Sequence, residues 1–204
     1  MNQKFKSALQ QQDGISYLKL SGVIDEDNAL FDLVERVGEQ VVILDLGEVE
    51  RINSCGVRDW VRWLSRLEQK CTEVIFVECS PAIVAQINLV GEFTKNGRVH
   101  SFYAPYFCPV CDVEKILLLQ TAEMKELDTL QPPTGRCNAC DSVMEFDDDV
   151  ESYFAFVEKA VYEPLSDEIS NFLGDMLDAE SAGGVRKVRT RGNTSPPAGD
   201  AVGK

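Results

Sequence analysis

The chain has 204 residues, a formal net charge of −14 and a pI near 4.5. This length allows one or two domains that each bury a core. The acidic balance argues against nucleic acid as the main partner, because Lys and Arg contacts to phosphate dominate that affinity. Residues 1–30 lack a basic start followed by an apolar run, and no stretch reaches the roughly 18 consecutive apolar residues of a membrane span. We therefore expect a cytoplasmic protein with no membrane span.

The first predicted elements alternate between strand and helix. Residues 15–23 alternate loosely between apolar and polar side chains, which indicates a strand. Residues 25–37 start with three acidic side chains and continue with apolar ones at helical spacing, which predicts a helix that ends at Gly38. Residues 41–46 form a short apolar run, typical of a strand that is covered on both faces.

A second helix follows this strand. Asn53 and Ser54 both offer a side-chain oxygen that can cap a helix N-terminus. Apolar residues between positions 57 and 67 recur at helical spacing, so one face of this helix should be buried. Residues 74–77 then indicate another buried strand.

The last elements of this region complete an alternating order. A serine followed by a proline at the first helical position predicts a helix from residue 80, and Gly91 should end it. Residues 99–103 indicate a closing strand. Strands that alternate with helices predict an α/β domain over residues 1–103, with a mainly parallel sheet and covering helices.

One segment of this domain adds a family resemblance. The sequence VVILDLGEVERINSCGVRDWVRWL resembles the central segment of STAS domains, the family shared by anti-sigma-factor antagonists and sulfate transporters. In antagonists a strand ends in D-L-S, and after a short loop D-S-S-G opens a helix. The resemblance covers about residues 5–103 and implies a STAS-like sheet that binds a regulatory protein partner.

The resemblance also singles out Ser54. It matches the antagonist serine that an anti-sigma-type kinase phosphorylates, and phosphate there prevents complex formation. Asn53 replaces the family aspartate, Cys55 replaces the second serine and Gly56 is kept. The alternative is that Ser54 is only a helix cap. Because a helix N-terminus tolerates added negative charge, phosphate at Ser54 would act on the partner rather than on the fold.

The same helix carries a basic stripe on an otherwise acidic domain. Arg58, Arg62 and Arg66 are spaced four residues apart and share one helix face. They are either a solvated face paired with nearby acids or a partner-docking surface. In the second interpretation, Trp63 beside the stripe is the candidate aromatic anchor.

Two C-x-x-C motifs predict a metal site. Cys108 and Cys111 form the first pair, Cys137 and Cys140 form the second, and 25 residues separate the pairs. Two such turns complete the tetrahedral four-sulfur shell of a structural Zn²⁺ site. A strand-like run follows each pair, so we predict a zinc ribbon over residues 104–150.

Two alternatives to zinc remain for these cysteines. They could form a redox dithiol or a pair of disulfides, although a reducing compartment disfavours both. The other three cysteines are expected to be small buried apolar residues: Cys55, Cys71 and Cys79.

The charge of the ribbon bears on its partner. Residues 104–150 contain three basic and ten acidic side chains, a net charge of −7. A surface of this sign repels phosphate, so the ribbon is expected to stabilise the chain or contact protein rather than nucleic acid.

The remainder of the chain is predicted to form C-terminal helices over residues 151–180 and a disordered basic tail over residues 181–204. Phe154, Val157 and Val161 are helically spaced, and after Pro164 comes an amphipathic helix. Its apolar face should pack back onto the ribbon or the sheet, and the alternative is a partner groove or self-association. The tail is rich in Gly, Pro and small polar residues and has a net charge of +4.

These features predict binding rather than catalysis. No triad or phosphate loop is visible, and four sulfur ligands leave a metal no open position for substrate. We therefore expect a non-enzymatic bacterial regulatory module whose STAS-like domain docks a signalling protein, with a serine kinase acting on Ser54 as the specific hypothesis. The alternative function is a scaffold or assembly subunit that does not switch.

Overall fold

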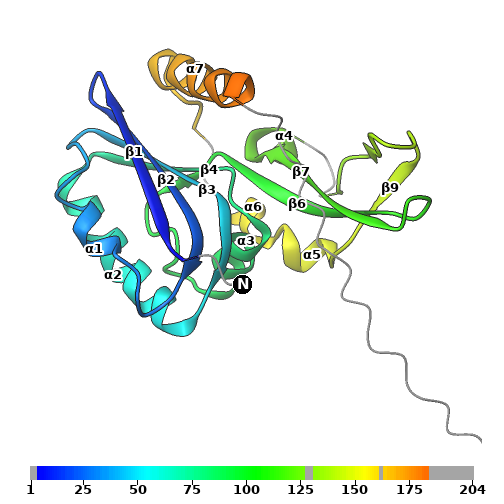
Figure 1. Ribbon diagram of the computed structural model, residues 1–204, viewed down its shortest axis with the longest axis horizontal. Coiled ribbons are helices and arrows are strands. Elements are labelled where there is room, and N and C mark those ends of the chain that lie inside the picture. Colours follow the sequence, from blue (N-terminus) through cyan, green and yellow to red (C-terminus); the bar gives the residue numbers. More distant parts are fainter. Residues whose placement is uncertain (1–3, 127–130, 161–162, 184–204) are drawn as a thin grey trace, which may run out of the picture.

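The computed structural model describes residues 4–126, 131–160 and 163–183. It contains two β-sheets, a five-stranded one in the first half of the chain and a four-stranded one in the second (Figure 1). Within these described ranges, no helix combines the length and the apolar character needed to cross a lipid bilayer. Val161 and residues 184–204 of the predicted tail lie outside the described residues, and residues 181–183 belong to the last helix.

The first sheet is mainly parallel, as predicted. Its strands, in spatial order, are β1 (Lys6–Gln12), β2 (Ile15–Ile24), β3 (Val41–Ile52), β4 (Glu73–Val77) and β5 (Arg98–Val99). The strands from β2 to β5 pair in parallel, whereas β1 pairs antiparallel with β2. β1 is the one strand of this sheet that the sequence pattern did not predict.

Three helices follow strands of this sheet: α1 (Leu30–Leu33), α2 (Ser54–Lys70) and α3 (Pro81–Leu89). The apolar residues of α2 and α3 pack against Leu18, Leu20 and Leu44 on one face of the sheet. The predicted helix over residues 25–37 is wrong in length, because only four residues are helical. Its acidic start forms a turn instead, in which Asp25 Oδ1 accepts from Asp27 N at 3.1 Å.

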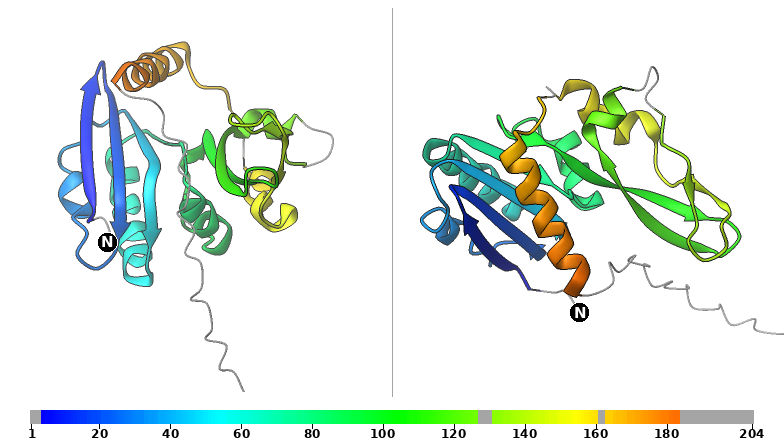
Figure 2. Two further views of the ribbon diagram at one scale, coloured as in Figure 1. Left: turned by 45° about the vertical axis from the view of Figure 1, so that its right-hand side comes forward. Right: turned by 90° about the horizontal axis from the view of Figure 1, so that it is seen from above.

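The opposite face of the sheet is covered by α7 (Asp167–Gly183), which lies across it in Figure 2. Ile169, Phe172 and Leu173 of this helix form a buried cluster with five residues of the sheet: Ile15, Tyr17, Ile43, Ile75 and Val77. The apolar stripe of the C-terminal helix therefore packs back onto the sheet, as predicted.

The second sheet has the strand order β7-β6-β9-β8. Its strands are β6 (Ser101–Cys108), β7 (Val113–Gln120), β8 (Gly135–Arg136) and β9 (Val143–Phe146), and the short helices beside it are α4 (Thr121–Lys125), α5 (Val150–Tyr153) and α6 (Ala155–Lys159). The predicted closing strand over residues 99–103 is wrong as one element. β5 ends at Val99 in the first sheet, and β6 begins at Ser101 in the second.

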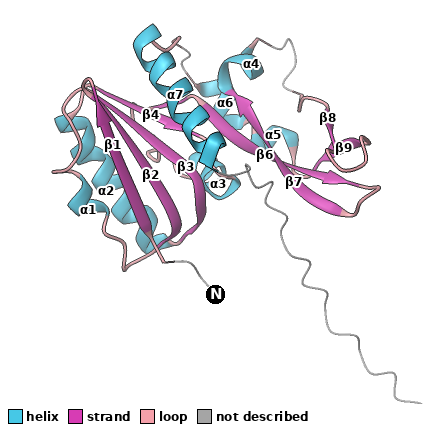
Figure 3. Cartoon of the chain, turned by 45° about the horizontal axis from the view of Figure 1, so that its top comes forward, coloured by secondary structure: helices cyan, strands magenta, loops and turns pink. Residues whose placement is uncertain are grey.

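The two halves share a core. A single buried cluster runs from α2 and α3 into the second sheet, and α5 and α6 contact α3 (Figure 1). Figure 3 shows the two sheets and the helices around them. The Asn88 side chain of α3 donates to Tyr153 O at 2.8 Å and accepts from Phe156 N at 3.0 Å. The Tyr153 hydroxyl donates to Tyr103 O at 2.6 Å. β6 itself crosses the domain boundary predicted at residue 103.

Candidate functional site

The four predicted ligand cysteines lie together. Their Sγ atoms are all within 4.8 Å of one another. The Sγ atoms of Cys108 and Cys140 are 3.5 Å apart, and those of Cys111 and Cys137 are 3.9 Å apart. Tetrahedral coordination with Zn–S bonds of about 2.3 Å places sulfurs roughly 3.8 Å apart. This donor set therefore fits a four-sulfur metal site.

Two equivalent turns bring the cysteines into place. Cys108 ends β6, and its carbonyl accepts from Asp112 N at 2.9 Å. Cys137 follows β8, and its carbonyl accepts from Asp141 N at 2.8 Å. Both aspartates have positive φ, 54° and 56°, a conformation that Asp adopts more readily than most residues. Each C-x-x-C pair is thus closed by an aspartate turn that directs two sulfurs to one point.

Four thiolates this close together would concentrate negative charge, which a bound cation would compensate. The Ala139 N–H is the main cause that lowers the pKa of the Cys137 thiol to about 6. A hydrogen bond with Cys140 is the main cause that raises the pKa of Cys111 to about 12. Neighbouring thiolates repel one another, so one of them keeps its proton unless a cation compensates the charge. A bound metal ion would allow all four to ligate as thiolates.

The second candidate site is the start of α2. Asn53, and not Ser54, is the N-cap: its Oδ1 accepts from Gly56 N at 2.8 Å. Its Nδ2 donates to Glu26 Oε2 at 2.8 Å, and this bond is the main cause that lowers the pKa of Glu26. The interpretation of Ser54 as the helix cap is therefore wrong. Ser54 is the first residue of α2 and is exposed.

Gly56 holds the start of α2 against the sheet. A Cβ at this position would lie 2.2 Å from the backbone oxygen of Ile24, the last residue of β2. No other residue type fits this approach without moving the helix. The glycine of the motif thus positions Ser54 at the end of the strand.

The arginine stripe faces solvent, but Trp63 does not. Arg58, Arg62 and Arg66 are all exposed. Trp63 is 0% exposed and contacts the Trp60 ring at 5.1 Å between centroids, so the prediction that it anchors a partner is wrong. Its spacing of three residues from Trp60 and four from Leu67 already matched the buried face of α2.

The arginines of the stripe interact with side chains of their own domain. Arg58 Nε lies 3.1 Å from Asp59 Oδ1, and this hydrogen bond is the main cause that lowers the pKa of Asp59. The Arg66 guanidinium lies 4.8 Å from the centroid of the Phe31 ring. The arginine side chains therefore contact neighbouring residues of the domain, and their guanidinium groups are still exposed to solvent.

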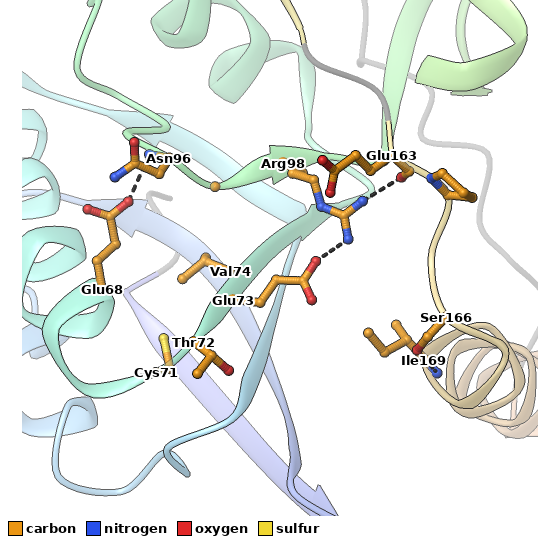
Figure 4. Close-up of a pocket in the computed structure, with 12 residues that line it drawn as sticks. Glu68, Cys71, Thr72, Glu73, Val74, Asn96, Arg98, Glu163, Ser166 and Ile169 are labelled. Atoms are coloured by element: carbon orange, nitrogen blue, oxygen red, sulfur yellow. Dashed lines mark hydrogen bonds and ion pairs between the residues drawn. The ribbon is translucent and has the colours of Figure 1, made fainter.

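A hollow of about 580 Å³, which no sequence pattern indicated, lies where the segment before α7 meets the sheet (Figure 4). Arg98 of β5 lies inside it and bonds both the Glu73 carboxylate and the Glu163 carbonyl. Glu68 accepts from Asn96 N at 2.8 Å in the same hollow. Arg98 is the only arginine that lines the hollow, and both of its bonds are to other residues of the chain. We therefore interpret these contacts as structural ones, which hold the segment before α7 against the sheet.

The parallel sheet and its covering helices define the first half as an α/β domain. Residues 6–103 match the family model for the STAS domain. This half of the chain is therefore a STAS domain, a module associated with regulation and protein interaction. A comparison with curated proteins finds no match to the chain.

Proposed function

We propose that this chain is a bacterial regulatory binding module whose α2 surface docks a signalling protein and whose docking is controlled by phosphorylation of Ser54. The observation that supports the proposal is that two different residues serve the start of α2, one as its cap and one as an exposed serine. Asn53 caps the helix, which leaves the exposed Ser54 hydroxyl available to a kinase. Gly56 keeps this serine in a fixed place on the domain surface.

Phosphate at Ser54 would change the docking surface more than the fold. It would add about two negative charges at the positive end of the α2 dipole, where the helix tolerates them. Arg58 lies four residues further along and is exposed, so it is within reach of an ion pair with the phosphate. The basic stripe would then be partly neutralised. A partner with an acidic surface would lose attraction and gain repulsion.

The four-cysteine site is proposed to hold a structural Zn²⁺. Four thiolates in a tetrahedral arrangement are the donor set typical of zinc, and they leave no position for a substrate. Cys108, Cys111, Cys137 and Cys140 would hold the ion, whose role is to fix the ribbon. The chain would accordingly act by binding and not as an enzyme.

The test is a kinase assay that locates the phosphate. The wild-type protein and Ser54→Ala are incubated with ATP and candidate anti-sigma-type kinases, and modified peptides are identified by mass spectrometry. Phosphate on Ser54 of the wild type, and its loss in the variant, would support the switch. If no kinase modifies Ser54 while a partner still binds α2, the chain is the non-switching scaffold.

A further inference from the structure

The first sheet has one long open edge. β1 is the terminal strand of the five, and no strand among the described residues pairs with its outer side (Figures 1 and 2). The other edge strand, β5, has only two residues and leads directly into β6 of the second sheet. An open strand edge presents unpaired backbone N–H and C=O groups that can pair with another strand.

β1 lacks most of the features that usually prevent an edge strand from pairing with another strand. All seven of its residues pair with β2 in one unbroken register, so it has no bulge. It contains no proline, and Lys6 is its only charged residue. Its side chains are exposed except for that of Leu9, which is half-buried. Natural edge strands are commonly interrupted by bulges, prolines or several charges.

The turn after β1 fixes which backbone groups face outward. Asp13 and Gly14 form a two-residue turn and both have positive φ, 49° and 83°. In such a hairpin the flanking pair, Gln12 and Ile15, is hydrogen-bonded. Since bonding alternates along an antiparallel pair, the even-numbered residues of β1 bond to β2. The outward groups therefore belong to three residues: Ser7, Leu9 and Gln11.

We propose that β1 pairs antiparallel with β1 of a second copy, centred on Leu9. The three outward residues are symmetric about this position: Leu9 meets Leu9, and Ser7 of each copy meets Gln11 of the other. All the outward groups of β1 thus find partners across a two-fold axis. The pairing would join two five-stranded sheets into one continuous sheet.

The charges at the two ends of β1 favour a second copy as the occupant. Lys4 and Lys6 stand at the start of the strand, and Asp13 stands in the turn after it. Antiparallel pairing centred on Leu9 brings this basic start beside the acidic turn of the other copy. The proposed pairing uses β1 and does not involve residues of α2.

The first experiment measures amide hydrogen exchange by NMR, together with sedimentation equilibrium at concentrations up to about 1 mM. In a monomer, the N–H groups of Ala8 and Gln10 are protected by β2, while those of Ser7, Leu9 and Gln11 exchange fast. The proposal predicts a dimer in which the second set becomes protected as concentration rises. A monomer at all concentrations, or unchanged fast exchange of that set, would overturn it.

The second experiment tests the register by charge reversal. In the proposed pairing, Ala8 faces Gln10 of the other copy, and both side chains are exposed. The double variants Ala8→Glu/Gln10→Glu and Ala8→Lys/Gln10→Lys should each be monomeric, because like charges lie opposite one another. Mixing the two variants should restore a dimer. Failure of the mixture to associate, or dimers of either variant alone, would contradict pairing centred on Leu9.

Discussion

The STAS domain and the ribbon are held together in different ways. The sheet of the STAS domain is covered on both faces by apolar side chains of its own helices and of α7. In the ribbon, β8 has two residues and β9 has four, and their loops converge on four cysteine sulfurs. The first region gains its stability from buried area, whereas the part of the ribbon around β8 and β9 would depend largely on the four proposed ligands. Substitutions in the two regions should therefore destabilise the protein in different ways.

The largest expected effect is loss of the metal site. Cys137→Ser removes one of the four proposed ligands, so we expect a zinc content of one ion per chain in the wild type and of near zero in the variant. The strands β8 and β9 should then lose protection from hydrogen exchange, while β2, β3 and β4 keep theirs. The reason is that small metal sites supply much of the folding free energy of the segment around them.

Cys55→Ser is the matched control for this change. Cys55 lies on α2, outside the cluster of four sulfurs, so its replacement should leave the metal content unchanged. Wild-type protein purified without chelators that contains no zinc but has an ordered ribbon would refute the metal assignment.

The second effect concerns the cover of the sheet. Phe172 of α7 is 8% exposed and packs against the sheet beside Tyr17. We expect Phe172→Ala to lower the free energy of unfolding by about 3 kcal/mol, as for other buried aromatic truncations. Leu89→Ala is the control, because Leu89 is 77% exposed and its truncation should change stability by no more than about 0.5 kcal/mol. Equal effects in denaturant unfolding would mean that α7 is not part of the core.

The third effect concerns the approach of α2 to β2. In Gly56→Ala, the new Cβ would clash with the carbonyl of Ile24, and backbone atoms have little room to move. We expect a loss of about 2 kcal/mol, as in other overpacked sites. Gly91→Ala has no atom within 4 Å of its new Cβ, so it should be neutral or slightly stabilising. A neutral Gly56→Ala variant would show that the helix start is not held as described.

The smallest effect on stability, and the largest on binding, is expected at the arginine stripe. Arg58 and Arg62 are exposed, so reversing both to Glu should change the unfolding free energy by less than about 1 kcal/mol. The same change should lower the affinity for an identified partner at least tenfold, mainly through a slower association rate. Unchanged affinity in a surface-binding assay would exclude the stripe from the docking surface.

The two regions also differed in how well the sequence predicted them. The ribbon site followed from the cysteine spacing alone, because ligand chemistry fixes the local geometry. The parallel strands β3 and β4 followed from their apolar runs, and β2 followed from a loose alternation of apolar and polar residues. β1 was missed because its mostly exposed residues lack the pattern of a half-buried strand, although Asp13-Gly14 is a known hairpin signal. The helix before Gly38 was overestimated because periodicity alone does not reveal the turn at Asp25.

The α2 surface was predicted less completely. The positions of Ser54 and the arginines on the helix were correct, but two details needed three-dimensional information. Asn53 and Ser54 both suit an N-cap by residue type, and only the backbone path decides between them. Trp63 was assigned to the surface by its proximity to the arginines in sequence, although helical spacing places it in the core.

The most direct measurement of the proposed function is a calorimetric titration of three proteins against the partner that a pull-down identifies. Ser54→Asp places a negative charge at the start of α2, and it should bind at least tenfold more weakly than the wild type. Ser54→Ala removes only an exposed hydroxyl, and it should bind as the wild type does. Equal affinities of all three proteins would contradict control through Ser54 and leave α2 without a switch.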